Sequence, residues 1–312
     1  MPAQAQYRNF CRTAPDVPVF AQPWYLDACA EGGTWDVVLA EEKGRIVAAL
    51  PFFYKQKGPF RYVTMPPFVK WLGPYLLPGF RGRLPKEHEL LQVLITQLPP
   101  LAAFKQNFYP TNTNWLPFYW QQFQQTTYYT YRLHRLRDLA RVKAGLGTGI
   151  RRDIRLARQQ VRVVHDRPPE EFHRVNMLSF ARQGLPAPYS MDQFRRLDAA
   201  LAAAGSRQLF FAVDAQNRVH SVAYLIWDAT TAYFLLAGDD PALRASGAGV
   251  LLAWEAICYA SEVLGLDCFD FEGSMLPGVE RMRVRFGAVQ TPYFYVWKHN
   301  SRLFELLEKL KT

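Results

Sequence analysis

Residues 244–249, with the sequence RASGAG, have the composition of a loop that binds a negatively charged ligand. An aromatic and aliphatic run of strand length precedes them at residues 231–237, and residues 250–264 after them are apolar on nearly all sides. A helix that starts directly after such a loop offers unpaired backbone N–H groups and the positive end of its dipole to an anion. Gly247 and Gly249 have no Cβ atom, so a ligand can lie against the backbone. The pattern predicts an anion-binding loop. The alternative is an ordinary helix N-terminus that contains two glycines and binds no ligand.

The strand expected at residues 266–271 carries Asp270 and leads directly into Glu272. Alternation along a strand places both carboxylates on one face. Ligands of α/β proteins bind beyond the carboxyl ends of strands, so Glu272 is the first candidate for a general base. Its structural alternative is a carboxylate that caps the following turn or pairs with Arg281 or Arg285. Asp270 lies deeper in the strand, and we expect it to be structural.

A third group of chemically relevant residues is basic. Residues 132–162 contain ten Lys or Arg and two acidic residues, a net charge of +8 within a chain whose net charge is +10. Arg151, Arg155 and Arg158 fall at i, i+4 and i+7, which is one face of a helix, and apolar residues take the adjacent face. These apolar residues are Ile150, Ile154, Ala157 and Val161. The pattern indicates either a packed amphipathic helix with solvated arginines or a surface that binds an anionic acceptor through guanidinium groups.

The composition indicates a globular protein that is long enough for two domains. The chain has 312 residues, of which 49% are apolar and 21% charged. No run of 18 apolar residues occurs and the N-terminus has no apolar signal segment, so we expect a cytoplasmic protein without a membrane span. The four cysteines show no CxxC spacing and no pair of the six histidines has ligand spacing. We therefore expect free thiols and no metal site.

The two halves of the chain repeat a similar order of strands and helices. Residues 39–46 (LAEEKGRI) match residues 211–219 (FAVDAQNRV) with one insertion, and each string falls in a predicted hairpin. Residues 123–129 (FQQTTYY) likewise parallel residues 286–294 (FGAVQTPYF), with two residues inserted. We infer an internal duplication with domains at 1–140 and 141–312. The glycine loop occurs in the second copy alone, so that copy is expected to hold the ligand, and residues 291–297 to close its sheet.

The pattern Arg-x-x-Gly-x-Gly between a strand and a helix resembles the acyl-CoA pyrophosphate loop of the GNAT superfamily of N-acyltransferases. Residues 270–274 (DFEGS) and 280–287 (ERMRVRFG) resemble the C-terminal signature of the FemAB-like branch of that superfamily, and residues 151–157 (RRDIRLA) resemble its Arg-rich helix. The resemblance covers most of residues 148–298. It implies an α/β fold of two tandem GNAT-like units, each a mixed, mostly antiparallel sheet flanked by helices, with the first unit degenerate.

The resemblance also implies a reaction and a set of site residues. An acyl group would pass directly from acyl-CoA to an amine acceptor in a ternary complex, without a metal. Backbone at the end of the strand at 231–237 would orient the thioester, and the loop would bind the pyrophosphate. The expected donor contacts are Leu236, Ala237, Arg244, Ser246, Gly247, Ala248 and Gly249. Beside the resemblance, the residues themselves make Glu272 the candidate base, and either Tyr189 or Tyr293 could act as acid to the leaving thiolate, with Tyr293 the one assigned here. The expected acceptor contacts are Arg151, Arg155, Arg158 and Tyr189.

Two other interpretations keep the same fold. In the first, the donor is an aminoacyl-tRNA, the product is an extended cell-wall peptide, and the basic segment binds tRNA phosphates. The intact loop and the lack of an inserted coiled-coil arm favour acyl-CoA over this donor. In the second, the pair of units is a non-catalytic binding module. The acceptor is expected to be a small-molecule or peptide amine, and an anionic one if the arginines contact it.

Overall fold

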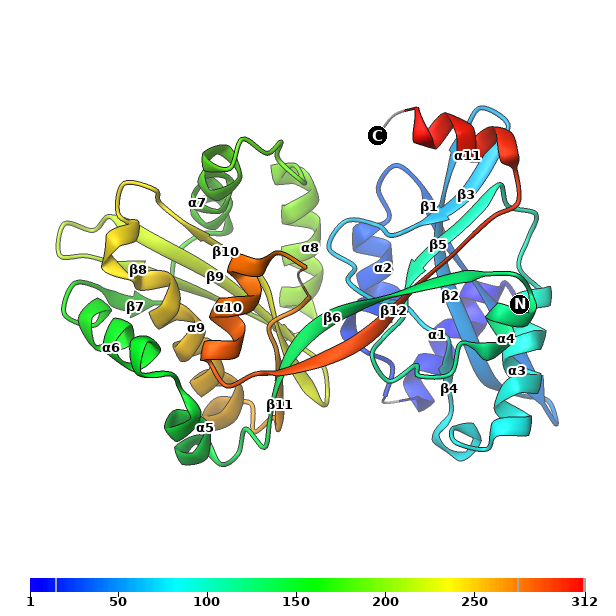
Figure 1. The fold of residues 1–312 in the computed structure, drawn as a ribbon, viewed down its shortest axis with the longest axis horizontal. Coiled ribbons are helices and arrows are strands. Elements are labelled where there is room, and N and C mark those ends of the chain that lie inside the picture. The colour runs from blue at the N-terminus through cyan, green and yellow to red at the C-terminus, as the bar shows by residue number, and fades with distance from the viewer. Residues whose placement is uncertain (15, 274, 311–312) are drawn as a thin grey trace. The chain divides into compact units, whose positions relative to one another are not determined.

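The computed structural model spans residues 1–312 and describes all of them except 15, 274 and 311–312 (Figure 1). The chain divides into two compact units. The first consists of Met1–Tyr128 together with Pro292–Thr312, and the second of Tyr129–Thr291. Two strands run from one unit into the other, β6 (Gln124–His134) and β12 (Val289–His299).

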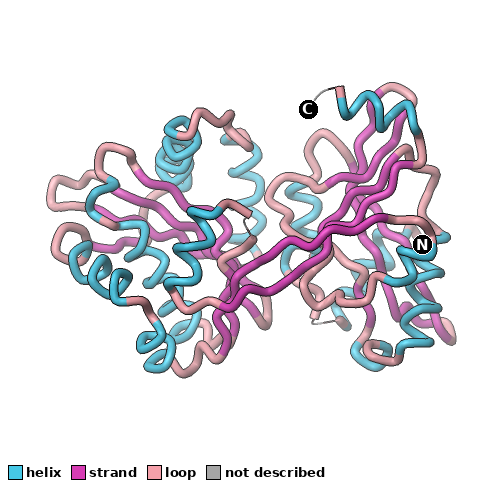
Figure 2. The backbone as a smooth tube through the Cα atoms, in the orientation of Figure 1, coloured by secondary structure: helices cyan, strands magenta, loops and turns pink. Residues whose placement is uncertain are grey.

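The first unit is a mixed sheet with helices (Figure 2). Its strand order is β1-β2-β3-β5-β12, with β4 also paired to β2; the β3–β5 pair is parallel and the other described pairs are antiparallel. The predicted hairpin is confirmed, and its two strands turn at Lys43 and Gly44, which both have positive φ. The elements are α1 (Ala3–Thr13), α2 (Pro23–Cys29), β1 (Thr34–Glu42), β2 (Arg45–Lys57), β3 (Phe60–Thr64), β4 (Tyr75–Leu76), α3 (Leu84–Thr96), β5 (Ala103–Asn107), α4 (Leu116–Trp120) and α11 (Arg302–Lys309).

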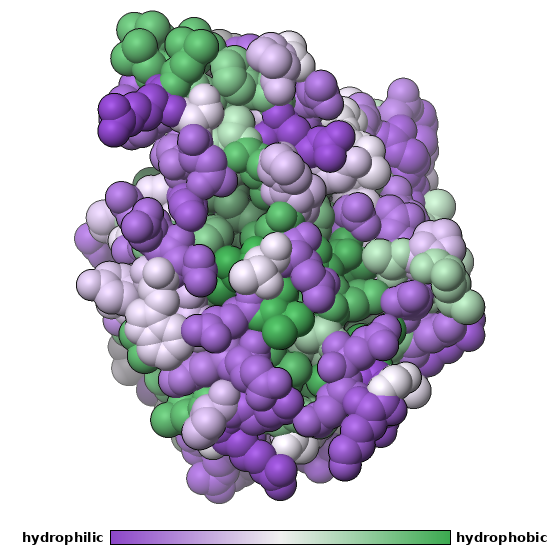
Figure 3. All heavy atoms as spheres, turned by 90° about the vertical axis from the view of Figure 1, so that its right-hand side faces the viewer, coloured by the Kyte–Doolittle hydropathy of each residue, from purple (hydrophilic) through white to green (hydrophobic). Residues whose placement is uncertain are grey.

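The helix α11 is held on the first unit by one buried aromatic side chain and by Glu308, which contacts Lys105 and His299. Phe304 is buried, and its ring centroid lies 4.9 Å from that of Tyr62 and 5.4 Å from that of Phe60. The opposite face of the helix exposes leucines at i, i+3, i+4 and i+7. These are Leu303, Leu306, Leu307 and Leu310. Figure 3 shows hydrophobic side chains gathered at the top of this side of the molecule, at the height at which Figure 1 places α11.

The second unit is also a mixed sheet between helices. Its strand order is β6-β11-β10-β9-β8-β7, in which the β10–β11 pair is parallel and the other pairs are antiparallel. The elements are α5 (Leu139–Gly145), α6 (Thr148–Ala157), β7 (Arg162–Val164), α7 (Pro169–Arg182), α8 (Met191–Ala203), β8 (Arg207–Val213), β9 (Val219–Trp227), β10 (Thr231–Asp239), α9 (Ala248–Cys258), β11 (Cys268–Asp270) and α10 (Pro277–Arg285). A π-helical turn (Tyr259–Val263) continues α9.

The two faces of the second sheet are covered by different helices (Figure 1). Phe210 belongs to the same buried cluster as Leu252 and Ile257 of α9. The next residue of β8, Phe211, points the other way because strand side chains alternate, and its ring meets Phe172 of α7. The helix α9 is apolar on nearly all sides because it lies between this sheet and α6, as its sequence predicted.

Most of β12 and the C-terminal part of β6 each belong to a different unit from the one that the sequence predicted. Residues 292–299 of β12 pair with β5 in the first unit, with Tyr295 opposite Asn107. The C-terminal part of β6 pairs with β11 in the second unit, with Leu133 opposite Phe269. The units therefore differ from the predicted ranges 1–140 and 141–312, and most of 291–297 does not close the second sheet. Alternation identifies a strand but does not name its partner, so this pairing was not visible in the sequence.

Candidate functional site

The predicted loop is present in the second unit between β10 and α9. Arg244–Ser246 forms one 3₁₀ turn, and Gly247 follows with φ 70° and ψ 15°, in the left-handed region that favours glycine. The helix α9 begins at Ala248. The predicted order of strand, glycine loop and buried helix is thus confirmed.

A cavity of about 730 Å³ opens at this loop, within the second unit. It is lined by α7, the ends of β9 and β10, the loop, the first turn of α9, and α10. Four of the seven predicted donor-binding residues line it, namely Ala237, Arg244, Gly247 and Gly249. Phe234 and Met282 give it apolar walls, while Arg182 and Arg244 are its two cations. The cavity therefore combines an apolar surface with positive charge at a helix N-terminus.

The two glycines of the loop lie against different neighbours. A Cβ atom on Gly249 would lie 2.8 Å from Oδ1 of Asp239 and 3.4 Å from Oγ of Ser221, two residues that also line the cavity. A Cβ atom on Gly247 would lie 3.8 Å from the carbonyl oxygen of Asp153 in α6. The loop thus passes between α6 and the end of β10, and α6 lies beside the cavity mouth.

The strand β10 separates from β11 before it reaches the loop. The two strands pair only from Thr231 to Tyr233, whereas β10 pairs with β9 as far as Asp239. A bulge interrupts the β9 pairing between Phe234 and Leu236. Among the described pairs, residues 234–239 are bonded to one neighbouring strand, and Ala237 is exposed at the cavity.

Tyr189 acts on this strand through a second side chain. Its hydroxyl donates to Oδ1 of Asn176, whose Nδ2 donates to the carbonyl of Ala237 at 2.7 Å. Burial raises the pKa of Tyr189 well above its ordinary value, so the phenol keeps its proton at neutral pH. Tyr189 itself does not line the cavity. Its predicted role as an acceptor contact stays a prediction, and the observed contact is with Asn176.

Asp270 is a structural carboxylate, as expected. It is fully buried, and its Oδ2 accepts from Nε of Arg132 at 2.6 Å. Its Oδ1 accepts from the hydroxyl of Thr130 and from the backbone N–H of Glu272 at 2.8 Å. These contacts commit both oxygens of Asp270 to holding β11 against β6.

The two predicted catalytic residues lie in different units. Glu272 is 9% exposed and has φ 58°, so the chain turns there and strand alternation does not determine where its side chain points. Tyr293 belongs to the first unit, where it is buried and its ring packs edge-on against Trp71 and Tyr128. Neither residue lines the cavity. Their catalytic roles stay predictions.

The basic helix has the predicted amphipathic form. Ile150, Ile154 and Ala157 of α6 are buried in the core of the second unit, as is Val161, which lies beyond the end of the helix. Arg151 and Arg155 are exposed, and Nη2 of Arg158 lies 2.9 Å from Oε1 of Glu255 in α9. The arginines do not line the cavity, and acceptor binding by them stays a prediction.

Three of the predicted donor contacts do not line the cavity. They are Leu236, Ser246 and Ala248. Ser246 is buried, its hydroxyl donates to the carbonyl of Leu243, and Nδ1 of His220 lies 3.0 Å from its Oγ. Sequence reasoning missed His220 and Asn176. A signal existed for Asn176, because it shares the buried face of α7 with Phe172 and Val175 at helical spacing.

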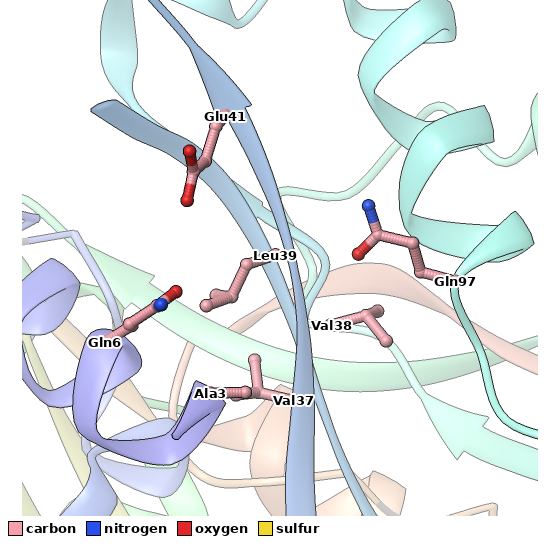
Figure 4. A pocket seen from close by; sticks show the side chains of 7 residues that line it. All are labelled: Ala3, Gln6, Val37, Val38, Leu39, Glu41 and Gln97. Carbon is pink, nitrogen blue, oxygen red and sulfur yellow. The ribbon is translucent and has the colours of Figure 1, made fainter. Parts of the chain in front are cut away.

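The first unit has a smaller cavity against its edge strand β1 (Figure 4). Its volume is about 380 Å³, and Glu41 is the one ionisable side chain that lines it. This cavity has no cation or glycine loop, so it offers nothing that would hold a phosphorylated ligand. Within the residues that the structure describes, no group of three or more His, Cys, Asp or Glu could hold a metal ion. No helix in the described part of the chain is long and apolar enough to cross a membrane.

Comparison with known proteins assigns this arrangement to a superfamily. Residues 146–282, less than half of the chain but most of the second unit, match the acetyltransferase (GNAT) domain family. The second unit therefore contains a GNAT acetyltransferase domain. A search of curated proteins found no match.

Solved structures share the two-unit fold. FemX has a TM-score of 0.73 at 12% identity, over 98% of each chain. A tandem GNAT protein from the clavulanic acid biosynthesis pathway has a TM-score of 0.55 at 12% identity, over 95% of this chain and 94% of its own. L-PGS from Bacillus licheniformis has a TM-score of 0.58 at 10% identity, over 96% and 92%. At these identities the likeness is one of fold. It confirms the predicted class of two tandem GNAT-like units and agrees with the FemAB-like branch.

Proposed function

We propose that the second unit binds an acyl-CoA at the loop and transfers its acyl group directly to an amine acceptor. The observation that carries this proposal is the cavity, which joins the N-terminus of α9 to the part of β10 that has separated from β11. A pyrophosphate at the loop and a thioester along residues 234–239 would then lie on one continuous surface.

The residues at the loop fit a pyrophosphate. Gly249 lets the first turn of α9 approach Asp239 and Ser221 more closely than a residue with a Cβ atom could, and Gly247 exposes the first turn of α9. Arg244 is more than half exposed, and its Nε lies 3.6 Å from Oδ2 of Asp239. Exposed pairs of this kind contribute little, so Arg244 is available to an incoming anion. Asp239 is a carboxylate at the same end of the cavity and offsets part of the positive potential there.

Acyl transfer requires an oriented thioester, a polarised carbonyl and a deprotonated amine. Backbone groups of Leu236 and Ala237 would orient the thioester. The bulge and the separation from β11, which expose this part of β10, support this role. Glu272 is our candidate for the base. Glu272→Gln is expected to lower kcat by about 10²- to 10⁴-fold while leaving donor affinity unchanged.

The acceptor is expected to approach past α6. The exposed arginines of this helix lie on the element that also contacts Gly247 through Asp153. A small-molecule or peptide amine that carries a carboxylate or phosphate would be attracted to this face. The same basic face favours a second candidate function, in which an aminoacyl-tRNA is the donor and its phosphates bind to α6.

Calorimetry on the intact protein separates these possibilities. Coenzyme A, acetyl-CoA and total tRNA would each be titrated at two salt concentrations. We expect acyl-CoA binding that Gly249→Val abolishes. Binding of tRNA alone, with affinity that falls steeply as salt rises, would establish the second candidate. Absence of binding by all three would favour the non-catalytic interpretation.

A further inference from the structure

Three buried polar side chains form a chain of contacts behind the loop. Ser246 is 4% exposed, His220 6% and Asp214 7%. Nδ1 of His220 lies 3.0 Å from Oγ of Ser246, and Nε2 lies 3.0 Å from Oδ2 of Asp214. Asp214 starts the turn between β8 and β9, His220 is on β9, and Ser246 is in the loop itself.

Asp214, at one end of this series of contacts, is held in place by several hydrogen bonds. Its Oδ1 accepts from the backbone N–H groups of Gln216 and Arg218, and its Oδ2 also accepts from Nε of Arg218 at 2.7 Å. Burial alone would raise the pKa of Asp214, but the hydrogen bonds from His220 and Arg218 hold it below its ordinary value. The carboxylate is therefore ionised at neutral pH and accepts hydrogen bonds only.

Hydrogen-bond counting shows that His220 links Asp214 to the loop in either protonation state. Nε2 must carry a proton, because Asp214 can only accept. The single proton of the Ser246 hydroxyl goes either to the Leu243 carbonyl, so that Nδ1 of His220 donates, or to Nδ1 itself. In both cases one bond joins His220 to Ser246. The backbone carbonyl of His220 adds a second attachment, since it accepts from the N–H of Asp240 at 2.9 Å.

The same three residue types serve as a nucleophilic triad in serine hydrolases. Here Ser246 is buried and does not line the cavity, so its hydroxyl is not presented to a substrate. A role in positioning fits the contacts better, because Ser246 comes directly before Gly247 and its Oγ also accepts from the N–H of Ala248 at 3.4 Å.

We propose that Asp214, His220 and Ser246 are positioning residues that fix the glycine loop in the conformation that receives the donor's phosphates. The ligand named in this inference rests on the proposed function. The claim that the three residues fix the loop does not. Loss of the link should leave the unit folded, loosen residues 247–250 and weaken donor binding. The rate with saturating donor should change little, because none of the three residues touches the reacting atoms.

The test compares His220→Leu and Ser246→Ala with His165→Gln in the full chain. His165 is a matched control in the same unit, because its Nδ1 also makes one bond, to the Leu209 carbonyl at 3.0 Å, and it does not line the cavity. Amide hydrogen exchange would be followed at residues 247–250 and coenzyme A affinity by calorimetry. Both His220→Leu and Ser246→Ala should speed loop exchange and raise the Kd for coenzyme A by about tenfold, with kcat within about twofold. His220→Gln, which retains an amide donor, should recover part of the affinity.

Unchanged exchange at residues 247–250 in folded Ser246→Ala and His220→Leu would overturn the proposal. A fall in kcat with unchanged donor affinity would also overturn it, because His220 would then act in the chemistry. If His220→Leu does not fold, Ser246→Ala decides alone, since it removes one oxygen atom. If the wild-type protein binds no coenzyme A, the proposed donor is wrong, and the exchange measurement still decides whether these residues fix the loop.

Discussion

Replacing Gly247 with alanine should separate the folding role of the loop from its binding role, because the second unit supplies a matched control. Gly247 has φ 70°, and a Cβ atom there would meet nothing closer than 3.8 Å. Gly265 has φ 64°, and a Cβ atom there would meet nothing within 4 Å. Gly265 follows the helix that begins at the loop, and it does not line the cavity. The two substitutions impose the same backbone strain with no steric clash.

The expected loss of stability is small and equal for the two variants. Left-handed backbone costs a residue with a Cβ atom about 1–2 kcal/mol. Alanine also lowers the conformational entropy of the unfolded chain, which offsets about 0.4–1 kcal/mol of that cost. Gly247→Ala and Gly265→Ala should therefore each lower the free energy of unfolding by about 1 kcal/mol. Chemical denaturation of both variants beside the wild type measures this directly.

Donor binding should distinguish them. If strain at Gly247 moves the first N–H groups of α9 by enough to lose one charge-assisted phosphate contact, binding weakens by about 1.5–3 kcal/mol. That corresponds to about a 10- to 100-fold rise in the Kd for coenzyme A. Gly265→Ala should leave the Kd unchanged. Equal coenzyme A affinity in the two folded variants would refute a phosphate site at this loop, as would a large loss of affinity in Gly265→Ala.

Three further outcomes are expected. Asp270→Asn should lower the free energy of unfolding by about 3–5 kcal/mol in denaturant titrations, because it removes the buried carboxylate that pairs with Arg132 at 2.6 Å; a change below 1 kcal/mol would contradict this. Replacing the exposed Arg151 and Arg155 together with glutamine should change stability by about 0.5 kcal/mol or less each, yet raise the acceptor KM in a salt-dependent way. An acceptor KM that is unaltered and independent of salt would show that the arginines do not contact the acceptor. Burial raises the pKa of Cys268 to about 11, so at pH 8 only about one thiol in a thousand is ionised. Alkylation of the half-buried Cys268 should be slow in the native protein and accelerate as pH rises, and rapid labelling at pH 8 would contradict the raised pKa.

The parts of the site that the sequence predicted are the local ones. A glycine loop between a strand and an apolar helix is specified by neighbouring residues, so its position followed from residues 231–264. The apolar stripe of α6 was equally local. These features depend on backbone preferences and periodicity that act over a few turns.

The parts that the sequence did not predict depend on which strands become neighbours. Ser246 meets His220 across 26 residues, and Asp270 meets Arg132 across 138. Tyr293 was a candidate catalytic acid and its strand was expected to close the second sheet, but that part of β12 pairs with β5 in the first unit. A pattern of alternation gives no information on such partners, so side-chain roles that rest on them stay open until the pairing is known.

The end of β10 illustrates how the fold prepares the site before any ligand binds. Its backbone is held from both sides of the strand: Asn176 donates to the Ala237 carbonyl, Ser221 donates to the Gly238 carbonyl at 3.0 Å, and Ser179 accepts from the Asp239 N–H at 2.9 Å. Gly238 is required there because a Cβ atom would lie 2.6 Å from the Cα of Asn176. A strand whose described pairing with β11 ends at residue 233 would otherwise be mobile, and ordering it on binding would weaken the donor complex. Side chains from α7 and β9 replace the missing strand, so the surface that we assign to the thioester is rigid although it is open.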